Sequence, residues 1–222
     1  MGDRILRMQR RLPIHKVQED GMISTCVAKT KAEAPRRRGK PILPTVAGCA
    51  TALLLWAVAG LFLYVVPATD APGHADVLFV LGPPDDRLGY AEQLMEQGHA
   101  DTLVVAVQQD SDSDPDLALC RERRAYRVVC FLPEPFTTQG EALTLQRLTT
   151  EYGWKSADVL TAQYHVTRAR VILQRCFKGD LGLIAYQQDL PVLSFTNPRG
   201  SWAYIFAYQT AAFIKVALNQ EC

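Results

Sequence analysis

The stretch TAQYHVTR, residues 161–168, places an imidazole and a guanidinium where an apolar run gives way to a helical pattern. Counting back four positions from Ala169, on the apolar face of that helix, reaches His165, so the ring is expected to extend the buried face beyond the strand. Arg168 follows within one turn. A lone histidine here is more often structural. Together, the imidazole, the guanidinium and a helix N-terminus favour a site for an oxyanion or phosphate.

The segment LGPPDDR, residues 81–87, also joins an apolar run to a helical pattern. Asp85 and Asp86 have an ordinary explanation, because carboxylates interact favourably with the positive end of a helix dipole. Arg87 opposes that dipole, which makes it a candidate for contact with an anionic ligand.

The segment TTQGE, residues 137–141, precedes a third helical pattern. Thr138 and Glu141 have the spacing of a capping box, in which the threonine accepts from the Glu141 amide and the carboxylate reaches back to the Thr138 amide. That local role explains both residues, but free amides and hydroxyls at a helix start also suit an anion. The sequence contains no Gly-rich P-loop, G-x-S-x-G elbow or H-E-x-x-H motif.

The elements that would position these residues alternate along the chain. Apolar runs of strand length occupy 75–81, 101–107, 126–132, 156–162 and 181–186, and helical patterns lie between them and over 202–218. The alternation predicts an α/β fold with a mostly parallel sheet of about five strands and helices on both faces. Ligands of such sheets bind beyond the carboxyl ends of the strands. We therefore expect His165, Arg168, Arg87 and Glu141 to converge on one pocket.

Residues 42–67 contain no charged side chain. This length suffices to cross a hydrocarbon core, which needs roughly 20 apolar residues. A buried core helix and a cleaved signal peptide are the alternatives. An uncleaved anchor is favoured, because the run exceeds the roughly 7–15 apolar residues of a signal sequence. Lys and Arg flank its start and are absent after it until Arg87, which predicts a cytoplasmic N-terminus and an extracytoplasmic C-terminal part at the plasma membrane.

Charge divides the chain into parts. Residues 1–41 carry eleven Lys/Arg against four Asp/Glu, and the chain after Pro67 carries thirteen against nineteen. The first part is expected to be a disordered basic tail, with 68–74 a linker and 75–222 one extracytoplasmic domain. The tail's charge is interpreted as a topology signal with lipid contact rather than a nucleic-acid site. The sequence leaves open whether Met1 or Met22 is the start.

Four cysteines fall in the outer domain, where an oxidising exterior permits disulfides. Three pairings are possible. Cys120 and Cys130 are predicted to bond because the first ends a short helix and the second lies in the next strand. Cys176 and Cys222 are predicted to bond because the helix before Cys222 is expected to pack near the helix of Cys176. No Cys/His cluster has metal-ligand spacing.

The segments VLFVLGPPDDRLGYAEQL, TTQGEA and VLTAQYHVTRARVILQRC resemble the YdcF-like family of envelope-associated proteins, which includes SanA and ElyC. The resemblance covers nearly all of 75–180. It implies a Rossmann-like three-layer domain, often behind one membrane anchor, and a role in cell-envelope or peptidoglycan biogenesis, with no settled reaction. The family pattern maps onto these residues: Gly82, Arg87, Thr138, Glu141, Thr161, His165 and Arg168. One departure is Val107-Gln108-Gln109, where the family usually has Ser-Gly-Gly.

The leading hypothesis is an anchored domain that binds or acts on an anionic, phosphate-bearing envelope metabolite, with a polyprenyl-phosphate-linked precursor as one candidate. His165 would be the acid/base or the phosphate contact, and Glu141 a base or the group that orients it. Arg168 and Arg87 would hold anionic oxygens, and Thr138 and Thr161 would bond the ligand. The alternatives are a non-catalytic sensing or scaffolding module and, by fold analogy alone, nucleotide or adenosylmethionine binding. No cofactor or protein partner is indicated.

Overall fold

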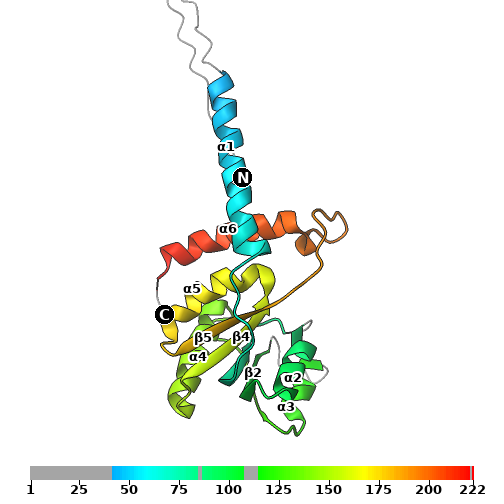
Figure 1. Cartoon of the computed structure of the whole chain (residues 1–222), viewed down its shortest axis with the longest axis vertical. Helices are drawn as coiled ribbons and strands as arrows, with labels where there is room; N and C mark the ends of the chain where they lie inside the picture. Colours follow the sequence, from blue (N-terminus) through cyan, green and yellow to red (C-terminus); the bar gives the residue numbers. More distant parts are fainter. Residues whose placement is uncertain (1–41, 85–86, 108–114, 221) are drawn as a thin grey trace, which may run out of the picture. The chain divides into compact units, whose positions relative to one another are not determined.

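The computed structural model describes residues 42–84, 87–107, 115–220 and 222. Five parallel strands form one sheet in the order β3-β2-β1-β4-β5 (Figure 1). The strands are β1 (Ala75–Val80), β2 (Ala100–Ala106), β3 (Arg127–Phe131), β4 (Ser156–Ala162) and β5 (Asp180–Tyr186). In the central pairing, Val77 of β1 is in register with Thr102 of β2 and with Ala157 of β4. The α/β class with a parallel sheet is the one predicted.

Helices cover both faces of the sheet, as right-handed crossovers between parallel strands require. The helices that follow the strands are α2 (Leu88–Glu96), α3 (Pro115–Arg121), α4 (Thr138–Tyr152), α5 (Val166–Cys176) and α6 (Trp202–Leu218). Alternate strand residues serve alternate faces. Phe79 and Val159 pack with α4 and α5, whereas Leu78 and Val80 pack with α2 and α3. The domain therefore has three layers, and the site lies at their common edge.

The segment before the domain contains the one helix in the described residues that is long and apolar enough to cross a membrane. It comprises α1 (Ile42–Gly60) and a π-helical turn, η1 (Leu61–Val65). The candidate span is Pro44–Val65, 22 residues with a mean hydropathy of 2.2. Most of its side chains are exposed, unlike those of a core helix.

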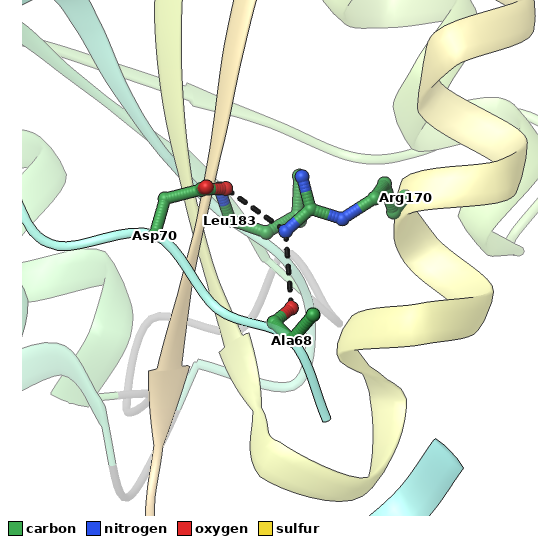
Figure 2. Close-up of polar contacts among 4 residues, drawn as sticks. All are labelled: Ala68, Asp70, Arg170 and Leu183. Atoms are coloured by element: carbon green, nitrogen blue, oxygen red, sulfur yellow. Dashed lines mark hydrogen bonds and ion pairs between the residues drawn. The ribbon is translucent and has the colours of Figure 1, made fainter. Parts of the chain in front are cut away.

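The predicted linker, residues 68–74, is fixed to the domain (Figure 2). Asp70 pairs with β5 through its own N–H to the Leu183 carbonyl, 2.9 Å, and through the Leu183 N–H to Asp70 Oδ2, 2.8 Å. Arg170 of α5 donates to Asp70 Oδ2 at 2.9 Å and to the Ala68 carbonyl at 3.1 Å. These contacts hold the chain leaving η1 beside the edge strand of the sheet.

Both predicted disulfides are present. Cys120 of α3 bonds Cys130 of β3 with 5.8 Å between Cα atoms, and Cys176 at the end of α5 bonds Cys222 with 5.0 Å. The second bond ties Cys222, four residues beyond the end of α6, to α5. Arg175 adds hydrogen bonds to the carbonyls of Val216 and Asn219 at 3.1 and 2.7 Å. Together they hold the C-terminal end of α6 against the three-layer domain.

Candidate functional site

A cavity of about 640 Å³ lies at the carboxyl edge of the sheet. Its walls include residues that follow β1 and residues that follow β4, which are adjacent central strands. The chain leaves β1 toward β2 on one side and leaves β4 toward β5 on the other, so this is the point where parallel α/β sheets open a crevice for ligands. The seven residues onto which the family pattern maps all line this cavity: Gly82, Arg87, Thr138, Glu141, Thr161, His165 and Arg168.

The predicted capping box at the start of α4 is wrong. Thr137 is the N-cap, with an extended backbone, and its hydroxyl accepts from the Gly140 N–H at 3.3 Å. The Glu141 N–H bonds the Thr137 carbonyl at 3.0 Å, so the Glu141 side chain is not needed at the helix end. Gly140 is required here, because a Cβ at that position would lie 2.0 Å from the Pro135 carbonyl oxygen. The helix start is thus built from backbone and Thr137, which leaves the Glu141 carboxyl for the cavity.

The Glu141 carboxyl points toward the loop after β1. Its Oε1 accepts from the Gly82 N–H at 2.6 Å, and the side chain is 4% exposed. A Cβ at Gly82 would lie 3.4 Å from the same oxygen, an ordinary van der Waals distance. Burial raises the pKa of Glu141 to about 7, although the Gly82 N–H and the charges of Arg87 and Arg168 act the other way. The carboxyl can therefore gain or lose a proton near neutral pH.

His165 lies in η3 (Gln163–His165), the 3₁₀ turn between β4 and α5, and is buried. Its Nδ1 bonds Thr161 Oγ1 at 3.0 Å, and its Nε2 bonds Thr138 Oγ1 at 3.4 Å. Burial, then the positive charges of Arg168 and Arg87, holds the pKa of His165 well below its usual value. The ring is neutral near pH 7. One of its nitrogens donates to a threonine hydroxyl and the other accepts from one.

The two arginines reach the cavity from different layers. Arg87 directly precedes α2, is 5% exposed, and donates to the Leu81 carbonyl at 2.9 Å. Arg168, in the first turn of α5, donates from Nε to Gln209 Oε1 at 2.9 Å. Both guanidinium charges act on Glu141 and on His165. Because arginine stays protonated in proteins, both positive charges are present at the wall of the cavity.

Helix α6 supplies a wall that the sequence analysis did not assign to the site. Tyr208, Gln209 and Lys215 line the cavity, and Gln209 is 1% exposed. A buried side-chain amide needs hydrogen-bond partners, and Arg168 provides one. The signal in the sequence was a glutamine within the otherwise apolar stretch 202–209.

Some singled-out residues lie outside the part of the chain that the structure describes. These are Asp85 and Asp86, and Gln108 and Gln109 of the loop that departs from the family pattern. Val107, at the start of that loop, lines the cavity. Among the described residues, no group of three or more His, Cys, Asp or Glu side chains has the arrangement of a metal site.

Four kinds of chemical group face this partly open cavity. Two guanidinium groups can bind anionic oxygens, a neutral imidazole can donate or accept, and two threonine hydroxyls fix that ring. A carboxyl with a pKa of about 7 can act as a general acid or base at physiological pH. Comparison with protein-family models, curated proteins and solved structures finds no match to the chain. Fold and site together define a parallel α/β domain with a crevice lined by two arginines at its topological switch point.

Proposed function

We propose that this chain is a membrane-anchored extracytoplasmic domain that binds and transforms an anionic, phosphate-bearing metabolite of the cell envelope. One observation carries the proposal: Arg87, Arg168, Glu141 and His165, each from a strand-to-helix junction, line one cavity. The side chains of two arginines and a carboxyl whose pKa is about 7 line this cavity, and the guanidinium groups can donate charge-assisted hydrogen bonds to the oxygens of a bound anion.

In the proposed reaction class, the arginines bind the oxygens of a phosphate or diphosphate, and Glu141 supplies or removes a proton. His165, held by Thr161 and Thr138, contacts the ligand as a neutral donor or acceptor. The Gly82 N–H is engaged by Glu141, so it becomes available to the ligand only when that carboxyl turns away. The envelope setting rests on the resemblance to the YdcF-like family and on the two disulfides, which suit an oxidising compartment.

The test is binding of inorganic phosphate and pyrophosphate to the full chain in detergent micelles, measured by titration calorimetry. Arg168→Ala and Arg87→Ala are each expected to weaken binding by tenfold or more, because a charge-assisted hydrogen bond contributes roughly 1.5–3 kcal/mol. Arg147→Ala is the matched control, because Arg147 is an exposed arginine of α4 whose partner in the structure is Glu151. Equal affinity in all three variants, or no binding by the unaltered chain, would contradict the proposal.

The alternative, a sensing or scaffolding module, uses the same cavity without turnover. It is favoured by the tight local bonding of His165, which a purely structural ring would share. Phosphate release from pyrophosphate and from a phosphomonoester separates the two. An enzyme releases phosphate, and Glu141→Gln slows release while pyrophosphate still binds. A module binds and releases nothing.

The orientation of the anchor is part of the proposal. The Lys/Arg excess before residue 42 predicts a cytoplasmic N-terminus. Protease added to intact cells should cleave the outer domain and spare the tail. Full protection of residues 70–222 would reject this topology.

A further inference from the structure

Helix α6 has three different faces. One faces the domain and the cavity, with these members: Ile205, Gln209, Ala212 and Val216. A second contacts the anchor helix through these side chains: Phe206, Thr210 and Phe213. At 3.6 residues per turn, a third stripe lies opposite the cavity, and its members are exposed: Ala203, Ala207, Ala211, Ile214 and Leu218. This third face is entirely apolar.

Contacts with the anchor fix α6 against the end of the candidate span. Trp56 Nε1 donates to Thr210 Oγ1 at 3.0 Å, and the Tyr64 hydroxyl lies 3.3 Å from the same oxygen. The Phe206 ring packs edge-to-face with Trp56 and Tyr64, with centroids 5.8 and 5.4 Å apart. A Cβ at Gly60 would lie 2.2 Å from that ring, so the ring rests directly on the helix backbone. About two turns of each helix take part, and α6 therefore crosses the anchor rather than running along it (Figure 1).

The length of the span decides where this crossing lies. A helix needs roughly 20 residues to cross a hydrocarbon core about 30 Å thick. Lys40 precedes the apolar segment and Pro67 follows it. From Ile42 to Trp56, which already contacts α6, the helix is only about 22 Å long. If α6 stood above the bilayer, the segment below it would be too short to cross. The last turns of the anchor, and α6 with them, must lie at membrane depth.

We propose that α6 is an interfacial helix that lies in the outer leaflet of the membrane crossed by α1 and η1, with bilayer lipid covering its apolar stripe. This inference rests on the anchoring part of the proposed function. The flank of α6 carries Tyr204 and Tyr208, with stacked rings 5.9 Å apart, and Lys215, the only charged residue of the helix. Tyrosine and lysine favour the headgroup region, where a polar tip and an apolar body are both accommodated.

The loop before α6 adds a second, independent apolar projection. Phe195 is 95% exposed and Leu193 is 63% exposed, which is unusual for large apolar side chains in water. Backbone bonds from Trp202 N–H to Pro191 and from Ala203 N–H to Val192, at 3.0 and 3.1 Å, hold this loop beside the start of α6. The exposed apolar side chains of the loop therefore lie near the start of the apolar stripe of α6.

Placing α6 in the outer leaflet also brings the cavity close to the membrane surface. Gln209 lies on the face of α6 opposite the apolar stripe, while Tyr208 and Lys215 on the flank also line the cavity. Helix α6, embedded in the membrane, thus forms one wall of the cavity, and the part of the wall formed by Tyr208 and Lys215 lies at the level of the headgroups. The anionic ligand of the proposed function would be a group presented at the membrane surface.

Depth-dependent fluorescence quenching in vesicles tests the proposal on the full chain. Cysteines at Ile214→Cys or Leu218→Cys carry an environment-sensitive dye in a Cys26→Ser, Cys49→Ser background, and the other cysteines remain in disulfides. The vesicles are phosphatidylcholine and phosphatidylglycerol with brominated acyl chains as the lipid quencher, and iodide is the aqueous quencher. Arg147→Cys is the exposed control on α4, and native Cys49 in the Cys26→Ser chain reports the span itself.

Labels at 214 and 218 are expected to show at least twofold greater lipid quenching than the label at 147, with protection from iodide. Iodide access equal to that at 147, while Cys49 is lipid-quenched, overturns the interfacial helix and leaves the anchor intact. Protection from both quenchers means that protein covers the stripe, which also overturns the proposal. Absence of lipid quenching at Cys49 rejects the span and the interfacial helix together.

Discussion

The carboxyl of Glu141 and the backbone N–H of Gly82 are joined by a 2.6 Å hydrogen bond across 59 positions of sequence. The bond links the first turn of α4 to the loop after β1, so two of the predicted strand-to-helix junctions touch. The same carboxyl does not cap its own helix, and its pKa is influenced by the charges of Arg87 and Arg168. Proton uptake by Glu141 is therefore coupled to the electrostatic state of the whole cavity.

Glu141 should make the folded state less stable as pH rises. Its pKa is about 7 when folded and about 4.5 in the unfolded chain, so the folded state binds more protons between these values. The contribution of Glu141 to the free energy of unfolding is fully present below pH 4.5 and is lost as pH rises through 7. The change in this free energy is on the order of 3 kcal/mol. Glu141→Gln keeps an oxygen for Gly82 and removes the titration.

The measurement is the unfolding temperature of the full chain in detergent from pH 5 to 8. The unfolding temperature of the unaltered chain minus that of Glu141→Gln should fall by roughly 5–10 °C as the pH rises from 5 to 8. A constant difference would show that Glu141 titrates normally.

His165 should produce the opposite slope. Its folded pKa lies well below the 6.5 of the unfolded chain, so the unfolded state binds more protons in that interval. Its contribution is present above pH 6.5 and is lost as pH falls toward the folded pKa. The variant His165→Gln can still bond Thr161. When the pH is lowered below 6.5, its unfolding temperature should fall less than that of the unaltered chain. Identical acid profiles for the two proteins would count against a buried neutral ring.

The strands of the sheet and the last helix could be predicted because they follow from local periodicity. Strand 156–162 and helix 202–218 were predicted with the limits that the structure has, and 75–81 differs from β1 by one residue. The start of α4 could not be settled, because Thr137 and Thr138 are adjacent and either hydroxyl can cap. The choice depends on Glu141 reaching Gly82, a contact that only the folded sheet creates.

The same reliance on contacts made only in the folded chain explains why Gln209 was not predicted as a residue of the site. Helical spacing predicted α6, but not which of its faces would meet Arg168, 41 positions earlier. The order of the strands determines which strand-to-helix junctions lie next to one another. Helix α6 follows β5, the last strand, so this rule does not assign α6 to the site. A polar amide in an apolar helix was the only local indication.

The two disulfides should differ in their effect on the cavity. Cys176–Cys222 closes a separation of 46 residues and holds the end of α6, whereas Cys120–Cys130 closes 10 residues in α3 and β3. Loop-closure entropy predicts a loss of about 4 kcal/mol for Cys176→Ser with Cys222→Ser, and about 3 kcal/mol for the other pair. Only the first double variant should also weaken phosphate binding, measured by calorimetry. Equal affinity in both variants would mean that the Arg175 contacts alone hold the cavity wall.

The final prediction concerns Gln209 as the positioning residue for Arg168. Gln209→Leu removes the acceptor for Arg168 Nε while keeping the volume, so the guanidinium loses its orientation. Phosphate affinity should fall severalfold, less than in Arg168→Ala. Gln209→Glu should weaken binding further, roughly tenfold or more, because a carboxylate pairs with Arg168 and repels the anion across the cavity. The same variant should raise the unfolding temperature relative to Gln209→Leu, since it restores a partner for Arg168.

Thr210→Val is the matched control on the neighbouring face of α6, where the contacts are with Trp56 and Tyr64, and it should leave phosphate affinity unchanged. If Gln209→Glu binds phosphate as tightly as the unaltered chain, Arg168 does not bind the anion.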